Sequence, residues 1–109
     1  YKAWLKDING KYLAVNDFLA KSANKIKSEM IGKTDIEIYP EELAKKYMSD
    51  DRNIMETRQS RYFQEISLTN GKPALHETYK TPVINESGEV IGTTGYTKDI
   101  SKMQEVSLY

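Results

Sequence analysis

Residues 6–16 of the chain read KDINGKYLAVN, with the pair Asn9-Gly10 between two β-rich runs. Asn-Gly is the strongest short-range signal for a two-residue hairpin loop, because both residues accept a positive φ. The pattern therefore predicts that residues 3–8 and 12–15 pair as antiparallel strands. Asn16 ends the stretch and is expected to cap a short helix that begins at Asp17.

Two further turn signals divide the C-terminal half of the chain. Asn70-Gly71 separates residues 61–69 from residues 74–84, and Glu86-Ser87-Gly88-Glu89 separates that run from residues 90–100. These three runs predict a meander of three strands. In the last run, the face expected to lie toward the core carries Val90, Thr94, Tyr96 and Ile100.

Helical patterns fill the segment of about 45 residues between the two strand groups, which is too long for a structureless loop. From residue 41 to about residue 58, apolar residues recur at spacings of three and four and predict one long amphipathic helix. Asp51 falls on this apolar stripe. In one interpretation, Asp50 or Asp51 kinks or re-caps the helix; in the other, Asp51 is a polar group facing an internal cavity. The order of two strands, helices and three strands indicates an α+β fold.

The composition excludes several classes of function. The 109 residues fit one domain, and 16 basic residues against 16 acidic ones give no net charge, so nucleic acid is not expected as a partner. Cysteine is absent, which removes thiolate zinc sites and cysteine nucleophiles, and the single histidine removes metal motifs that need two imidazoles. No metal site is therefore expected. No apolar run approaches the roughly 20 residues of a membrane-spanning helix, so a soluble segment without membrane contact is expected.

The two ends of the sequence indicate an excised segment. The chain starts at Tyr1 without an initiator methionine. Residues 101–104 have the form of a capping box and predict a further helix, in which the chain ends. A larger parent protein is therefore expected.

At four places the chain resembles PAS sensor domains. Residues 6–16 are similar to the opening hairpin and first helix cap of that family, and residues 31–35 (IGKTD) to the segment before its central helices. Residues 80–83 (KTPV) and 88–92 (GEVIG) resemble its closing hairpin. Lys98-Asp99-Ile100-Ser101 resembles its terminal Asp-Ile-Thr signature, with Ser in place of Thr. The four motifs stand in the family's order and cover nearly the whole chain.

The resemblance implies a five-stranded antiparallel sheet in the order 2-1-5-4-3, with helices packed on one face around a small cavity. It implies a PAS sensory domain over residues 1–100, followed over residues 101–109 by the start of a signalling helix toward an output domain. The parent is then a bacterial signalling protein with a diguanylate cyclase or histidine kinase output. The sensory domain is expected in the cytoplasm even where the parent is membrane-anchored. Signal relay is expected at Asp99, Ile100 and Ser101.

The chain differs from the family's cofactor-binding branches, and these differences exclude some classes of ligand. A covalent flavin is excluded because the chain has no cysteine, and haem is not expected because the long central helix carries no histidine. A flavin held without a covalent bond stays open, with Trp4 and the tyrosines as ring partners. A small metabolite, or no ligand at all, is expected.

Candidate cavity residues are aromatic and polar side chains expected between the long helix and the sheet. They are Tyr47, Met55, Tyr62, Gln64, His76, Tyr79 and Tyr96. Tyrosine combines ring contact with a hydroxyl group that needs a partner when buried, which suits a pocket wall as well as a plain core. For His76, an exposed strand position is weighed against a pH-sensitive or ligand-bonding role.

Three hypotheses of function follow. In the first, the domain binds a small metabolite in its cavity and relays that state to an output domain. In the second, a PAS module without ligand serves only in homodimerisation and signal relay. In the third, a small α+β enzyme uses Asp51 together with His76. The domain itself is expected to be non-catalytic, and a homodimer is expected.

Overall fold

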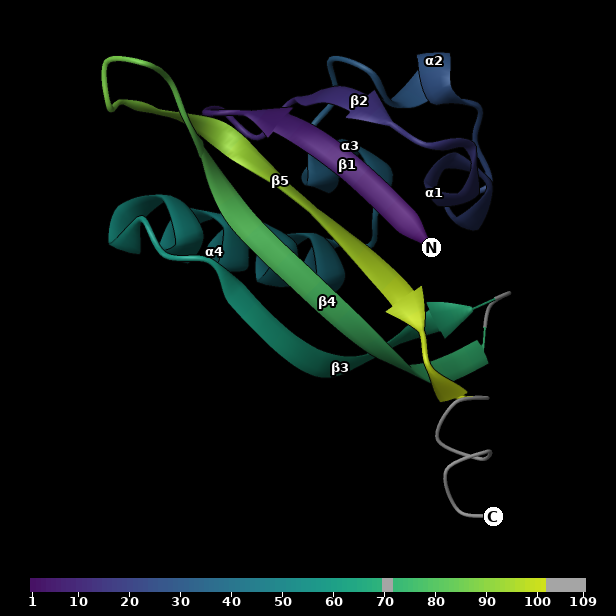
Figure 1. Cartoon of the computed structure of the whole chain (residues 1–109). Coiled ribbons are helices and arrows are strands. Elements are labelled where there is room, and N and C mark those ends of the chain that lie inside the picture. The colour runs from purple at the N-terminus through teal and green to yellow at the C-terminus, as the bar shows by residue number, and fades with distance from the viewer. Residues whose placement is uncertain (70–71, 102–109) are drawn as a thin grey trace.

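Among the residues that the structure describes, five strands form one antiparallel sheet, and four helices lie between the second and third strand in sequence and on one face of the sheet (Figure 1). The computed structural model describes residues 1–69 and 72–101. The strand order β2-β1-β5-β4-β3 confirms the predicted order. The strands are β1 (Lys2–Asp7), β2 (Tyr12–Val15), β3 (Arg61–Thr69), β4 (Lys72–Ile84) and β5 (Val90–Asp99). The helices are α1 (Asp17–Ser22), α2 (Lys27–Met30), α3 (Asp35–Ile38) and α4 (Glu41–Thr57).

The first hairpin forms as predicted, but its loop is longer than two residues. The amide of Asp7 donates to the carbonyl of Lys11 at 2.9 Å, so three residues separate the closing pair. Gly10 has a φ of +81°, whereas Asn9 is not among the residues with positive φ. The loop is therefore of the three-residue kind that needs one left-handed glycine. The carboxylate of Asp7 holds it by accepting hydrogen bonds from the amides of Asn9 and Lys11, both at 2.9 Å.

Asn16 caps α1 as predicted. Its side-chain oxygen accepts a hydrogen bond from the amide of Leu19 at 3.0 Å, the arrangement of an N-cap. The same oxygen accepts from the amide of Ala3 at 3.1 Å. The cap therefore also ties the start of α1 to β1.

The long helix α4 is continuous through Asp51, so the interpretation that this residue kinks or re-caps the helix is wrong. Ala44 and Ile54 on the predicted apolar stripe are fully buried. Asp51 is buried with them. A carboxylate at such a position requires a cationic partner from another element.

The face of β5 that turns toward the helices is the opposite of the predicted one. Thr93 and Thr97 are buried on the helix side, while Tyr96 stacks on Tyr79 of β4 on the other side of the sheet. Of the four residues expected at the core, Ile100 is buried. The expectation fails because it ranked faces by hydrophobicity, whereas the covered face here is polar.

The main apolar cluster lies at one end of the molecule rather than under the middle of the sheet. It consists of Tyr12, Val15, Leu19, Ala20 and Met30, from β2, α1 and α2. Two sequence-based predictions fall outside the described residues. They are the Asn70-Gly71 turn between β3 and β4, and the helix over residues 101–109, of which only Ser101 is described.

Candidate functional site

A cavity of about 300 Å³ lies between the sheet and the helices. All five strands contribute to its wall, together with α1, α3, α4 and the loops that join them. Its lining residues are Lys2, Trp4, Lys6, Tyr12, Leu19, Ser22, Ala23, Asn24, Ile38, Tyr39, Pro40, Leu43, Tyr47, Glu65, Ser67, Lys80 and Thr97.

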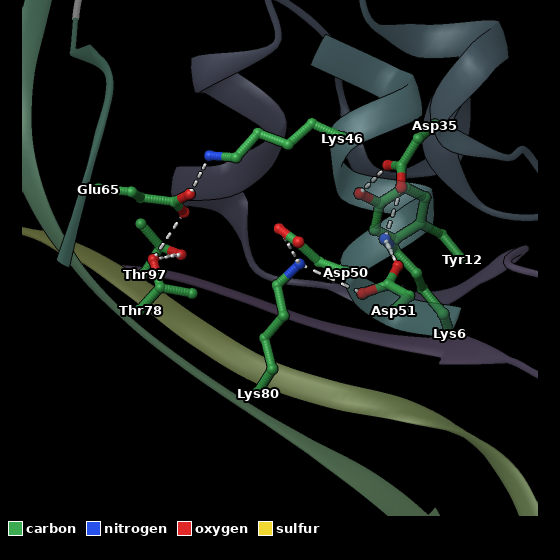
Figure 2. Close-up of polar contacts among 10 residues, drawn as sticks. All are labelled: Lys6, Tyr12, Asp35, Lys46, Asp50, Asp51, Glu65, Thr78, Lys80 and Thr97. Atoms are coloured by element: carbon green, nitrogen blue, oxygen red, sulfur yellow. Dashed lines mark hydrogen bonds and ion pairs between the residues drawn. The ribbon is translucent and has the colours of Figure 1, made fainter. Parts of the chain in front are cut away.

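One side of the cavity is formed by a closed charge network centred on Lys6 (Figure 2). The ammonium group of Lys6 lies 2.6 Å from a carboxylate oxygen of Asp35 and 2.6 Å from one of Asp51. The hydroxyl group of Tyr12 donates to the other oxygen of Asp35, also at 2.6 Å. These residues come from β1, β2, α3 and α4, so the network holds the sheet and two helices together.

The pKa shifts in this network follow from burial and from the partners. Burial disfavours the charge of Lys6, but Asp51 and Asp35 outweigh it, and the pKa of Lys6 is raised above its usual value. Burial is also the main reason that the pKa of Tyr12 is raised, reinforced by Tyr39 and Asp35. Lys6 therefore stays charged and Tyr12 stays neutral at physiological pH.

Lys80 of β4 approaches the same carboxylate from the other side but is held less tightly than Lys6 (Figure 2). Its ammonium group donates to Asp51 at 3.3 Å and lies 4.0 Å from Asp50. The ring centroids of Trp4 and Tyr47 lie 5.8 Å and 5.6 Å from the same nitrogen. Lys80 is thus a buried cation with hydrogen-bonding capacity to spare, set between two aromatic rings.

A second polar cluster forms the opposite wall (Figure 2). Glu65 of β3 accepts hydrogen bonds from Lys46 at 2.6 Å and from the hydroxyl group of Thr78 at 2.9 Å. Thr78 shares a further hydrogen bond of 3.0 Å with Thr97. The hydrogen bond to Glu65 raises the pKa of Lys46. The cluster connects a carboxylate of the cavity wall to β5, the last strand.

Trp4 brings an unpaired donor to the cavity. Its indole nitrogen is shielded from solvent and has no hydrogen-bond partner among the described residues. A buried indole N–H group normally has an acceptor.

Of the predicted cavity residues, Tyr47 lines the cavity. Met55 lies half-buried on α4 and is not part of the wall. His76 is 1% exposed, so the expectation of an exposed strand position is wrong. Its Nδ1 atom lies 2.9 Å from the carbonyl oxygen of Ala74, and the residue is absent from the cavity wall.

Four other predicted residues lie on the opposite face of the sheet from the cavity, which corrects their expected place between helix and sheet. They are Tyr62, Gln64, Tyr79 and Tyr96. Thr78 and Lys80 alternate with Tyr79 along β4 and point toward the helices, so Tyr79 points away from them. Hydrogen bonds from Ser60 and Thr81 lower the pKa of Tyr79. The four residues are brought together, but outside the cavity.

The structure does not bring Asp51 and His76 together. Asp51 contacts Lys80, and His76 stands four residues further along β4, a separation of about 13 Å in an extended strand. The pairing on which an enzyme mechanism would depend is thus absent. Asp51 lies beside the cavity, as the interpretation of a polar group facing an internal cavity predicts. There it is the ion-pair partner of Lys6 and Lys80.

Sequence reasoning missed most of the polar wall. The missed residues are Lys6, Tyr12, Asp35, Glu65 and Lys80. One signal could have found part of it: a carboxylate on a buried helix stripe needs a cation, and lysines inside predicted strands are the available partners. The pairing itself depends on the tertiary fold.

The predicted relay residues are joined to β4 at the end of the sheet. The amide of Ile100 donates to the carbonyl of Leu75 at 3.0 Å, and the hydroxyl group of Ser101 accepts from the amide of Leu75 at 3.2 Å. The carboxylate of Asp99 accepts from the amide of Ser101 at 2.8 Å. Ile100 and Ser101 are thereby held against β4.

The model of the protein family described as "PAS fold" matches residues 3–105. The chain therefore belongs to the PAS family. PAS domains are sensory rather than catalytic, and the chain is a PAS sensory module.

Comparison with known proteins places this module among signalling proteins. A diguanylate cyclase from Vibrio cholerae serotype O1 is 28% identical over 106 residues, which cover 94% of this chain and 33% of that protein. The chain thus spans a third of the length of this relative.

Three solved structures share the fold. VqmA of Vibrio cholerae in complex with a ligand and DNA has a TM-score of 0.80 and 24% identity, over 91% of this chain and 45% of that chain. The PAS domain of Bordetella pertussis BvgS has a TM-score of 0.72 and 21% identity, over 98% of this chain and 80% of that one. A sensor histidine kinase from Vibrio cholerae has a TM-score of 0.75 and 15% identity, over 91% of this chain and 82% of that one. At these identities the likeness shows the fold alone.

The exclusion of nucleic acid as a partner is wrong. It rests on the zero net charge of this domain, whereas VqmA carries a domain of the same fold and is solved in complex with DNA. The match covers 45% of the VqmA chain. The charge of a sensory domain therefore does not decide which partners the whole protein binds.

Within residues 1–69 and 72–101, no helix has the length and apolar character needed to cross a bilayer.

Proposed function

We propose that this domain is the cytoplasmic input module of a bacterial signal-transduction protein and binds a small molecule in the cavity between its helices and its sheet. The observation that carries the proposal is the cavity wall. It contains two buried lysines, Lys6 and Lys80, and Trp4, whose indole N–H group has no acceptor within residues 1–69 and 72–101. A module that serves only in dimerisation has no need of a cavity with an unpaired polar group.

The route of relay runs from the cavity wall to the last strand. Glu65 is hydrogen-bonded to Thr78, and Thr78 to Thr97, which stands two residues before Asp99. An occupant that moves Glu65 or Thr97 changes the packing of β5 and, with it, the contacts of Ile100 and Ser101 with β4. Residues 1–100 then form the sensor, and residues 101–109 begin the connection to the output domain.

The output is proposed to be a diguanylate cyclase or a histidine kinase. The proposal is supported by the likeness to a diguanylate cyclase and by the fold shared with a sensor histidine kinase. Its test uses the full-length parent. There, Asp99→Ala removes the carboxylate that accepts from the amide of Ser101. The response of output activity to signal is expected to change, and an unaltered response would contradict the relay.

Native mass spectrometry of the purified domain, compared with its denatured mass, tests the sensor function. A stoichiometric mass excess that disappears on denaturation is expected. Leu43→Trp places a large ring in the cavity wall and should remove the excess. Tyr62→Trp places the same ring on the opposite face of the sheet, where Tyr62 is exposed, and should leave the mass excess unchanged.

The second candidate function is a ligand-free module that serves in homodimerisation and relay. It is favoured by the aromatic side chains on the open face of the sheet, among them the stacked pair Tyr79 and Tyr96, with ring centroids 5.9 Å apart. This candidate would be supported if the domain is a dimer without any mass excess and Leu43→Trp leaves the dimer unchanged. The same result would contradict the sensor function.

A further inference from the structure

The single histidine of the chain is buried on the face of the sheet that lies under the helices. His76 is 1% exposed and alternates along β4 with Thr78 and Lys80, which point toward the helices. Its Nδ1 atom lies 2.9 Å from the carbonyl oxygen of Ala74. A carbonyl oxygen only accepts hydrogen bonds, so Nδ1 carries the hydrogen atom of the neutral ring. The other ring nitrogen, Nε2, is then the atom that takes up a proton.

Two carboxylates flank His76 on this face, one on each neighbouring strand. Glu65 of β3 and Asp99 of β5 are its direct partners in the strand register. Side chains directly opposite each other on one face have Cβ atoms about 4.5–5.5 Å apart. Glu65 lines the cavity, and Asp99 alternates along β5 with Thr97, which shares a hydrogen bond with Thr78 on the covered face. Burial alone would disfavour a positive charge on the ring, but here two carboxylates compensate it.

Charged and titratable groups of two further elements face this cluster. They are Lys2 of β1 and, from α4, Lys46 and Tyr47. Burial lowers the pKa of Lys2, against the opposing effects of Glu65 and Asp99, and burial raises the pKa of Tyr47. Lys46 pairs closely with Glu65, at 2.6 Å. Because this pair holds Glu65 in place, a further positive charge on the ring acts on Asp99.

Asp99 connects the histidine to the end of the sheet. Its carboxylate accepts a hydrogen bond from the amide of Ser101 at 2.8 Å. Leu75, which precedes His76, also holds this segment. Its carbonyl accepts from the amide of Ile100 at 3.0 Å, and its amide donates to the hydroxyl group of Ser101 at 3.2 Å. A change of charge at His76 therefore occurs beside both elements that hold Ser101.

From these contacts we propose that the domain senses pH, with the proton as its ligand and His76 as the binding site. When Nε2 takes up a proton from water, the ring gains one positive charge and a second hydrogen-bond donor. The carboxylate of Asp99 then turns toward the ring, and its hydrogen bond with the amide of Ser101 weakens. This function goes beyond the proposed binding of a small molecule, because it needs no occupant of the cavity.

A pH titration of the purified domain by nuclear magnetic resonance tests the proposal. The ring of His76 gives a single imidazole signal, because the chain has no other histidine. Imidazole changes charge between pH 5 and 8, and the ring signal is expected to move in this range. The amide signal of Ser101 should move upfield as the pH falls, with the same midpoint, because its hydrogen bond weakens.

Two variants test the connection between the ring and Ser101. His76→Asn keeps a donor for the carbonyl of Ala74 but takes up no proton, so the movement of the Ser101 amide signal should disappear. Asp99→Asn keeps an acceptor for the amide of Ser101 but removes the charge that the ring attracts. In this variant the ring should still titrate, while the Ser101 amide signal should no longer follow. Circular dichroism checks that both variants are folded.

A second pair of variants tests the electrostatic surroundings of the ring without changing the histidine. Glu65→Gln removes one flanking charge and should lower the midpoint of the ring titration by about one pH unit. The matched control is Glu77→Gln. Glu77 follows His76 directly in sequence, but it pairs with Lys98 on the opposite face of the sheet. The control should move the midpoint much less, and equal shifts in the two variants would contradict the placement of the ring between Glu65 and Asp99.

The outcomes separate this inference from the proposed function. If the ring signal does not move between pH 5 and 8 in the folded domain, His76 is not a proton-binding site. If the ring titrates but the Ser101 amide signal does not follow, or follows equally in His76→Asn, the pH-sensing function is wrong. The mass excess that tests the small-molecule sensor is measured separately, so either function can fail while the other stands.

Discussion

The two faces of the sheet carry the reverse of the usual pattern. The face under the helices presents buried polar side chains, among them Lys6, Thr78 and Lys80. The open face presents large apolar side chains such as Tyr62 and Ile66, which are 57% and 64% exposed. Antiparallel sheets with one covered face commonly pack the apolar side on the core. The difference indicates that the covered face of this sheet lines a site, while the main apolar cluster lies beside it.

A covered polar face is stable only if its groups are paired. The two buried lysines contact the same carboxylate, Asp51, and Lys6 has a second partner in Asp35. On the open face, Lys98 pairs with Glu77 at 3.2 Å, but its side chain is 42% exposed and in contact with water. A lysine should therefore contribute very differently to stability on the two faces.

The largest expected effect is that of Lys6→Met. The change leaves Asp35 and Asp51 buried without their main cation, and losing one partner of a buried ion pair typically costs about 3–5 kcal/mol. Urea unfolding followed by circular dichroism measures the free energy of unfolding. Lys98→Met on the open face serves as the control and should cost about 1 kcal/mol or less. Equal losses in the two variants would refute the contrast between the faces.

The next effect is a loss of stability at alkaline pH. The pKa of Lys6 and the pKa of Tyr12 are both raised in the folded state. A raised pKa contributes stability that is fully present below the unfolded value, near pH 10 for both groups, and is lost as the pH rises through the folded value. The free energy of unfolding should therefore stay level between pH 7 and 9 with respect to these groups and fall above pH 10.

Tyr12→Phe is the control for this pH dependence. It removes one of the two groups, and with it one proton released on unfolding, so the fall above pH 10 should be less steep. Its slope would be compared with that of the unmodified domain in urea unfolding at each pH. An unchanged slope would mean that the Tyr12 hydroxyl group does not contribute, contrary to its burial against Asp35.

The architecture could be predicted from the sequence because its signals are local. The Asn16 cap, the apolar stripe of α4 and the position of each strand depend on neighbouring residues, and the structure has all three. The hairpin loop at Asn9-Gly10 is predicted to have two residues but has three. The hydrogen bonds that Asp7 accepts from the loop stabilise this longer form. The strand order needed the family resemblance, since spacing alone does not give it.

The site could not be predicted in the same way. Lys6 and Asp51 are 45 positions apart in sequence, and nothing near either residue indicates its partner. The hydrophobic pattern also predicts the wrong face, because Tyr79 and Tyr96, which are expected at the pocket, stack on the opposite face of the sheet. Local patterns therefore predict the elements of this domain, whereas its cavity depends on pairs that only the tertiary fold creates.

The smallest expected effect is that of Tyr96→Leu on the open face. The change removes one ring of the Tyr79–Tyr96 stack, and such pairs contribute about 1 kcal/mol beyond their buried area. The mass excess expected in native mass spectrometry should not change, because the sheet separates Tyr96 from the cavity. A loss of the mass excess like that expected for Leu43→Trp would show that the binding site reaches the open face. The contrast between a site-forming face and an open face would then no longer hold.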